Sequence, residues 1–180
     1  MTDYFALLEE ARRPWLEPEK LKDKYYRTSR SAAPDAELNE AFRVLSDPKL
    51  RLHHLLALEG TELPSGRPVP DSVAELFWNT GRLLREVERW LLQSAGTTGA
   101  LPRSLLKAEQ AKLEGKLARL EEQLRATYES ELEHLRQLDA GWGAGSPNEM
   151  SQLRELYDSI SYLTRLLERA SEKRFQLDVA

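Results

Sequence analysis

The chain has 180 residues, enough for one domain or two small ones. Lysine and arginine number 26 and aspartate and glutamate 30, so the formal net charge is −4. This balance argues against a nucleic-acid binder, because such proteins usually carry a basic excess. The absence of cysteine excludes disulfides and thiolate ligands for zinc or an iron–sulfur cluster.

The N-terminal residues lack the features of a secretory signal. Residues 1–13 have neither a basic beginning nor a long apolar core. The longest uninterrupted apolar run covers residues 4–8, far below the ~20 residues needed to cross a bilayer. We therefore expect a cytoplasmic protein with no membrane partner.

Four helices are expected in the N-terminal third of the chain. Asp3 is a suitable N-cap for a short helix over residues 4–8. A second helix should begin near Pro18, because proline fits the first turn, and it carries many lysines and arginines. Apolar residues at helical spacing predict a third helix over residues 36–45 and a fourth over residues 48–58.

A connector rich in proline and glycine follows at residues 61–70. Together with Gly60 it contains three prolines and two glycines, a composition that cannot continue a helix. The connector therefore separates a first unit at residues 1–60 from a second at residues 71–180.

The second unit predicts three long helices, at about residues 71–94, 102–138 and 147–175. In the middle helix the leucines recur mostly every three or four residues, as expected when one face is buried over many turns. Ser146 and Glu149 form a capping box at the start of the last helix. Three long antiparallel helices predict a three-helix bundle, and the fold class is all-α.

The sequence offers no convincing catalytic or metal-binding pattern. His53 and His54 are adjacent, point about 100° apart on a helix, and are interpreted as surface or helix-packing residues. Residues 141–145 are rich in glycine but have neither a preceding strand nor a following Gly-Lys-Ser/Thr, so we interpret them as a turn. A di-metal carboxylate site needs Glu-x-x-His motifs on two facing helices, and the sequence has this spacing only once, at Glu131 and His134. We expect neither an enzyme nor a bound cofactor.

Five segments form a further pattern: residues 3–5 (Asp-Tyr-Phe), 38–42 (Leu-Asn-Glu-Ala-Phe), 45–48 (Leu-Ser-Asp-Pro), 55–60 (Leu-Leu-Ala-Leu-Glu-Gly) and 162–166 (Tyr-Leu-Thr-Arg-Leu). Together they resemble the HscB class of J-domain co-chaperones, which serve iron–sulfur cluster assembly. The resemblance covers most of the chain. It implies an N-terminal J-like helical domain followed by a C-terminal antiparallel three-helix bundle.

One departure from that family falls on its signature. A J-domain acts through a His-Pro-Asp tripeptide between its second and third helices, and here that place reads Ala33-Pro34-Asp35. The alanine side chain neither donates nor accepts a hydrogen bond. Only four residues separate Asp35 from Glu40, where the family has a longer loop. Either this J-like domain is degenerate, or a segment that carries the histidine is missing from the sequence.

By resemblance, the second helix and the following loop bind a DnaK/HscA-class ATPase chaperone and promote its ATP hydrolysis. The residues carried over to this role are Lys22, Lys24, Arg27, Arg30, Pro34 and Asp35. Complementary charges of this kind set the association rate and the orientation more than the affinity. The alternative interpretation is a solvated helix face.

The bundle, by resemblance, binds an IscU-class iron–sulfur scaffold or another client. The apolar positions that fit this patch are Leu76, Phe77, Leu83 and Tyr162. Phe77 and Trp78 are adjacent, so at least one leans away from the bundle core, and an exposed aromatic is a plausible binding anchor. The alternative is that both pack inside.

These observations favour an HscB-like co-chaperone that recruits a chaperone ATPase and presents a client to it. A non-catalytic J-like adaptor, which has lost ATPase stimulation, is the alternative that Ala33 favours. A nucleic-acid binder that uses the basic second helix is a third possibility, which the acidic remainder of the chain disfavours.

Overall fold

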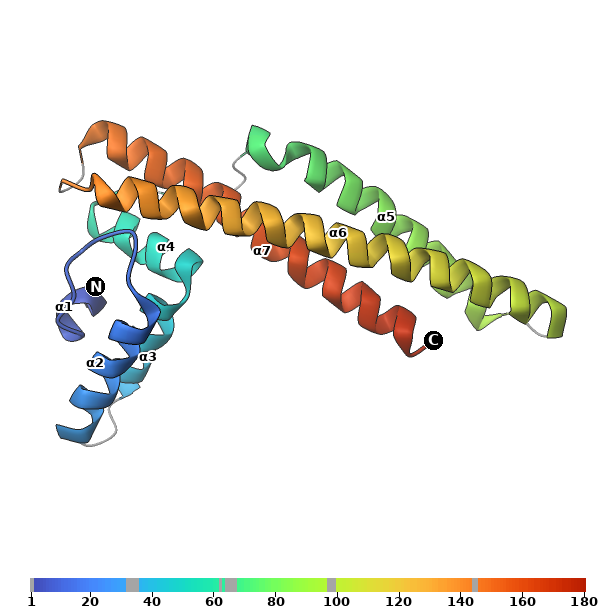
Figure 1. Ribbon diagram of the computed structural model, residues 1–180, viewed down its shortest axis with the longest axis horizontal. Coiled ribbons are helices and arrows are strands. Elements are labelled where there is room, and N and C mark those ends of the chain that lie inside the picture. The colour runs from blue at the N-terminus through green and yellow to red at the C-terminus, as the bar shows by residue number, and fades with distance from the viewer. Residues whose placement is uncertain (1, 32–35, 62, 64–67, 97–99, 144–145) are drawn as a thin grey trace. The chain divides into compact units, whose positions relative to one another are not determined.

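The structure is a computed structural model that describes residues 2–31, 36–61, 63, 68–96, 100–143 and 146–180 (Figure 1). These residues form seven helices and no strand, which confirms the all-α prediction. The helices are α1 (Tyr4–Leu7), α2 (Pro18–Ser31), α3 (Ala36–Ser46), α4 (Pro48–Leu58), α5 (Asp71–Ala95), α6 (Ala100–Ala140) and α7 (Pro147–Asp178).

The contacts between residues divide the chain into two units. The N-terminal unit contains Met1–Pro68 and Glu131–Ile160, and the bundle unit contains Val69–Ser130 and Ser161–Ala180. The first division lies close to the connector expected at residues 61–70. The end of α6 and the beginning of α7, however, group with α1–α4 instead of with the bundle, because side chains near the α6–α7 turn pack against the segment between α1 and α2.

The N-terminal unit begins with a capped helix, as predicted. One carboxylate oxygen of Asp3 accepts hydrogen bonds from the backbone N–H of Phe5 at 3.0 Å and of Ala6 at 3.2 Å. The other accepts one from Arg12 Nε at 2.9 Å. Burial opposes ionisation of Asp3, but the hydrogen bonds from Arg12 and Ala6 outweigh it and lower the pKa of the carboxyl. The cap therefore also fastens the segment that follows α1.

The core of the N-terminal unit is built from the apolar faces of α1–α4. Tyr25 of α2 stacks on Phe42 of α3 with ring centroids 4.3 Å apart, and its hydroxyl donates to Asn39 at 2.7 Å. Asp47 caps α4 by accepting from the N–H of Leu50 at 2.9 Å. Full burial of each leucine contributes about 1.5–3 kcal/mol. Deeply buried apolar side chains from residues 1–60 of the unit include Phe5, Leu8, Leu21, Leu38, Leu45, Leu52, Leu55 and Leu56.

His54 lies inside this core, consistent with a helix-packing role. Its Nε2 accepts a hydrogen bond from the backbone N–H of Tyr4 at 3.1 Å, and its ring stacks on the Tyr4 ring at 4.6 Å. Burial lowers the pKa of His54, and the nearby carboxylate of Asp3 opposes this only in part. The neutral imidazole therefore joins α4 to α1.

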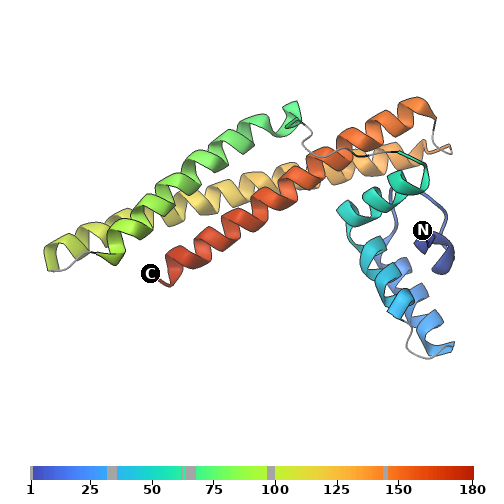
Figure 2. The ribbon, with the colours of Figure 1, turned by 180° about the vertical axis from the view of Figure 1, so that it is seen from behind.

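The bundle unit packs α5, the N-terminal part of α6 and the C-terminal part of α7 around a continuous core (Figures 1 and 2). The bundle prediction is confirmed in this part of the chain. Trp90 of α5 is buried and donates from Nε1 to the carbonyl of Leu106 on α6 at 3.2 Å. Arg174 of α7 pairs with the buried Glu121 of α6 at 2.9 Å. The fully buried side chains include Val73, Val87, Leu117, Leu124, Leu163 and Leu177.

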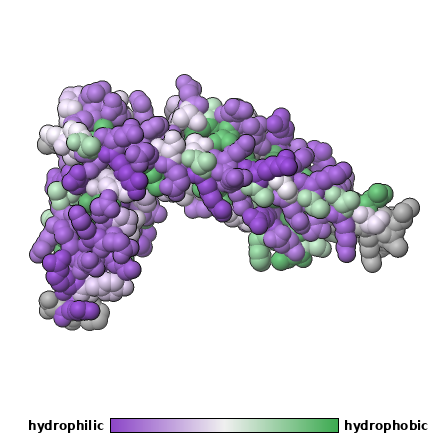
Figure 3. All heavy atoms as spheres, in the orientation of Figure 1, coloured by the Kyte–Doolittle hydropathy of each residue, from purple (hydrophilic) through white to green (hydrophobic). Residues whose placement is uncertain are grey.

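The surface is mostly polar. Charged residues make up 31% of the chain, and hydrophilic residues (purple) dominate the face that Figure 3 shows, with smaller apolar patches (green) among them. None of the helices in the described ranges combines the length and apolar character that crossing a membrane requires.

Replacing His54 with glutamine is expected to reduce the acid sensitivity of the fold. Unfolded, the imidazole titrates near pKa 6.5, and folded it titrates lower, so between these values the folded state binds fewer protons. Stability that is fully present above about pH 6.5 is therefore lost as the pH falls toward the folded pKa. Urea unfolding, followed by circular dichroism between about pH 7.5 and 5.5, measures this loss.

The matched control is His53→Gln, on the same helix but exposed. We expect His53→Gln to keep the wild-type pH profile and His54→Gln to flatten it. The same slope in wild type and His54→Gln would show that His54 does not govern acid sensitivity.

Candidate functional site

The basic face of α2 follows from the way this helix packs. Leu21 is buried and Tyr25 stacks on α3, and these two residues, four apart, define the inward side of α2. Lys22, Arg27 and Arg30 lie exposed on the remainder of the helix. Three of the four cations predicted for chaperone binding are therefore accessible to a partner.

Lys24 differs from these three cations. Its Nζ donates to the carbonyl of Glu9 at 2.7 Å and pairs with the Glu10 carboxylate at 2.8 Å. The side chain is half-buried and ties α2 to the segment after α1. Lys24 therefore holds α2 in place within its unit. The remaining predicted chaperone-binding residues, Pro34 and Asp35, lie outside the described residues, as does Ala33.

A buried carboxylate at the end of α6 organises the segment between α1 and α2. Asp139 accepts hydrogen bonds from Arg13 Nε at 2.9 Å and from the backbone N–H of Trp15 at 3.0 Å. A second guanidinium nitrogen of Arg13 also donates to this carboxylate. Just beyond α6, Trp142 Nε1 donates to the carbonyl of Arg12 at 3.1 Å. These contacts hold a segment with little regular secondary structure against the α6–α7 turn.

The Trp15 ring has two arginines close to it. The guanidinium of Arg136 on α6 is 4.2 Å from the ring centroid, and that of Arg51 on α4 is 5.7 Å away, both within cation–π range. Arg51 is buried and donates to the carbonyls of Pro14 at 2.9 Å and Leu45 at 2.7 Å. Sequence reasoning missed this cluster. The available signal was a tryptophan beside a proline outside any predicted helix, because the large apolar ring of such a tryptophan needs a neighbouring element to cover it.

Two residues predicted to bind a client come together in the bundle unit. Phe77 of α5 and Tyr162 of α7 form an edge-to-face pair with centroids 6.2 Å apart. Trp78 packs edge-to-face against Phe77 at 5.3 Å and is itself 70% exposed. The guanidinium carbon of Arg165 lies 4.6 Å from the centroid of the Tyr162 ring. We call Phe77, Trp78 and Tyr162 the aromatic face.

The other two predicted client residues lie elsewhere on α5. Leu76 is half-buried and packs against the bundle core. Leu83 is only 9% exposed, and its remaining surface lines a groove between α5 and α6. Six residues at about 100° each place Leu83 about 120° around the helix from Phe77. Leu83 therefore does not belong to the aromatic face.

Comparisons of the chain with protein-family models and with curated proteins found no match. In the part of the chain that the structure describes, no group of three or more histidine, aspartate or glutamate side chains is placed to hold a metal ion. The predicted site residues that the structure describes therefore contribute to two surfaces, one basic and one aromatic.

Asp139→Ala is expected to lower the free energy of unfolding by about 2 kcal/mol, because Arg13 and the Trp15 N–H both lose a charged acceptor. Arg13→Ala should lower the free energy of unfolding by less in the Asp139→Ala background than in the wild type. Urea unfolding of the two single variants and the double variant measures this coupling.

Glu155→Ala, at an exposed position of α7 in the same unit, is the control and should change stability little. Strict additivity of the Arg13 and Asp139 effects would contradict a coupled pair.

Proposed function

We propose that this protein is a J-domain-like co-chaperone of the HscB type. It binds a DnaK/HscA-class ATPase chaperone through α2, presents an IscU-class scaffold or another client on the aromatic face, and stimulates ATP hydrolysis by the chaperone. The observation that carries the proposal is the aromatic face on α5 and α7, because an indole that is 70% exposed has the character of a binding anchor.

The chemistry of the aromatic face supports protein binding. Tryptophan and tyrosine bury a large area on association and keep a polar group for the rim, which is why both are enriched where interfaces form. Arg165 adds a cation beside Tyr162, and arginine is likewise enriched at such sites. A client with an apolar, weakly acidic surface fits this face.

The charge on α2 supports the chaperone half of the proposal. Lys22, Arg27 and Arg30 are exposed, while packing and the Lys24 contacts hold the helix itself. A row of cations on a fixed helix steers an acidic partner and selects its orientation.

A non-catalytic J-like adaptor is the second candidate, and Ala33 favours it. An alanine supplies no side-chain hydrogen bond at the position where the family's histidine acts. The adaptor would bind through the same two faces without stimulating ATP hydrolysis.

Single-turnover ATP hydrolysis by the host's DnaK/HscA-class chaperone tests the proposal. We expect the protein to accelerate hydrolysis, and Lys22→Ala with Arg30→Ala to raise the concentration needed roughly fivefold, since each exposed ion pair is worth about 0.5 kcal/mol. Lys112→Ala with Arg154→Ala removes the same charge at exposed positions of α6 and α7 and should leave stimulation unchanged.

Ala33→His separates the two candidates. Stimulation that appears only in Ala33→His would favour the adaptor. If neither the folded wild type nor the folded Ala33→His variant stimulates ATP hydrolysis, the co-chaperone function is contradicted altogether.

Client binding provides an independent test. Phe77→Ala and Tyr162→Ala should weaken binding of the host's IscU-class scaffold, and Trp78→Ala should weaken it by about 30-fold, the effect of losing a ~2 kcal/mol anchor. Isothermal titration calorimetry measures the affinity, and circular dichroism checks that helix content is unchanged.

Leu92→Ala is the matched control, because Leu92 is a highly exposed apolar residue of α5 outside the aromatic face. Unchanged affinity in both Phe77→Ala and Tyr162→Ala would contradict the client site. Absence of binding by wild type would contradict the scaffold as client.

A further inference from the structure

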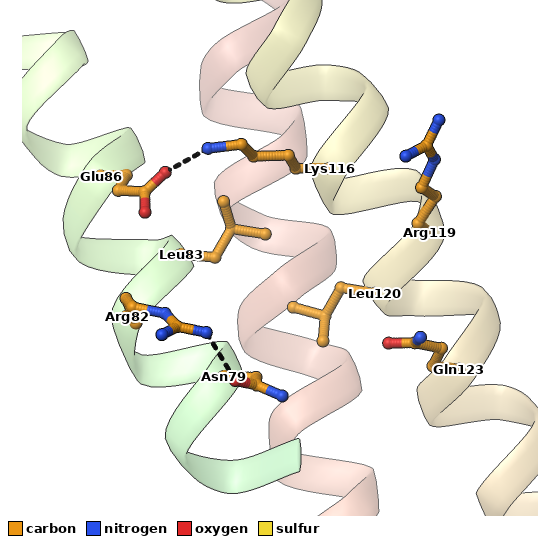
Figure 4. Close-up of a pocket in the computed structure, with 8 residues that line it drawn as sticks. All are labelled: Asn79, Arg82, Leu83, Glu86, Lys116, Arg119, Leu120 and Gln123. Atoms are coloured by element: carbon orange, nitrogen blue, oxygen red, sulfur yellow. Dashed lines mark hydrogen bonds and ion pairs between the residues drawn. The ribbon is translucent and has the colours of Figure 1, made fainter. Parts of the chain in front are cut away.

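The bundle unit contains a groove that the proposed function does not use. It lies between α5 and α6 and has a volume of about 510 Å³ (Figure 4). The aromatic face is formed by α5 and α7, so the groove involves a different helix pair.

The floor of the groove is apolar. Leu83 of α5 and Leu120 of α6 are 9% and 5% exposed and belong to the bundle core. Both side chains lie in the space between the two helices in Figure 4. They offer a place where one apolar side chain of a ligand is removed from water.

The rim of the groove is cationic. Lys116 is paired with Glu86, the only acidic residue in the lining, at 2.6 Å. Arg82 donates to the neutral side chain of Asn79 at 2.8 Å, which leaves its charge uncompensated. Arg119 is exposed, and neither Arg82 nor Arg119 forms an ion pair within the described part of the chain. Two guanidinium groups are therefore available to an anionic ligand.

One end of the groove also carries two side-chain amides. Asn79 and Gln123 lie there on the opposing helices (Figure 4), and each amide both donates and accepts hydrogen bonds. This is the complement of a peptide bond, which has one donor and one acceptor.

We propose that this groove binds a short acidic peptide segment of a partner protein. One apolar side chain of the segment covers Leu83 and Leu120, and flanking carboxylates pair with Arg82 and Arg119. Guanidinium is suited to this because it binds carboxylates in a bidentate manner and is weakly hydrated. The apolar floor favours a peptide over a polynucleotide or free phosphate, which present no aliphatic side chain.

Fluorescence anisotropy with the full chain tests this inference. The probe is a fluorescein-labelled peptide, Glu-Glu-Glu-Leu-Glu-Glu-Glu. We expect saturable binding that weakens with added salt and weakens when serine replaces the central leucine. Arg82→Ala with Arg119→Ala should reduce the affinity about tenfold. Both positions are exposed, and circular dichroism confirms the fold of the variant.

Two further variants sharpen the test. Arg154→Ala with Arg169→Ala removes the same charge from exposed positions of α7 and should leave peptide binding unchanged. Arg82→Glu with Arg119→Glu should lose the glutamate peptide and bind the corresponding lysine peptide, Lys-Lys-Lys-Leu-Lys-Lys-Lys.

Three outcomes would overturn the inference. They are an absence of saturable binding, equal binding of the leucine and serine peptides, and tighter binding of a ten-nucleotide oligothymidylate. The last would identify a general polyanion site. Chaperone stimulation and scaffold binding depend on other residues, so these outcomes do not decide the proposed function.

Discussion

The buried carboxylate of Asp139 is the contact on which the arrangement of the N-terminal unit depends. It accepts from Arg13 and from the backbone N–H of Trp15, in the segment between α1 and α2. That segment in turn fixes α1 through Arg12 and Asp3, and α2 through Lys24 and the carbonyl of Glu9. A hydrogen bond made by α6, more than a hundred residues later in the chain, thus anchors the segment that leads into α2.

Arg51 is a second buried charged residue that connects separate segments of this unit. A guanidinium taken out of water is costly unless its donors are satisfied. Here the acceptors are the carbonyls of Pro14 and Leu45, and the guanidinium lies near the Trp15 ring. The Arg51 side chain therefore donates both to a carbonyl at the end of α3 and to a carbonyl in the segment before α2. The elements of this unit are thus joined through polar groups as well as through the leucine core.

The sequence predicted what local chemistry determines. The cap at Asp3 and the capping box of Ser146 and Glu149 mark helix starts that the structure confirms. The roles of Asp139 and Arg51 could not be predicted in this way, because their partners lie far away in the chain and both residues look like ordinary surface charges. The Phe77–Trp78 pair predicted that one aromatic leaves the core. Which one does so depends on the phase of α5 to within a single residue, and the interruption at Thr80 and Gly81 obscures that phase.

The phase of α5 also explains how one helix carries two surfaces of different chemistry. Thr80, Leu84 and Val87 are buried and mark the core side of the helix. At about 100° per residue, Phe77 lies on one flank of this stripe and Leu83 on the other, whereas Trp78 and Arg82, four residues apart, are neighbours on the outward side. Leucine at position 83 falls on the second flank, where it deepens the groove floor and cannot extend the aromatic face. Because Trp78 and Arg82 are adjacent on the outward side of α5, the aromatic face and the rim of the groove meet there, and a partner bound to one surface reaches the edge of the other.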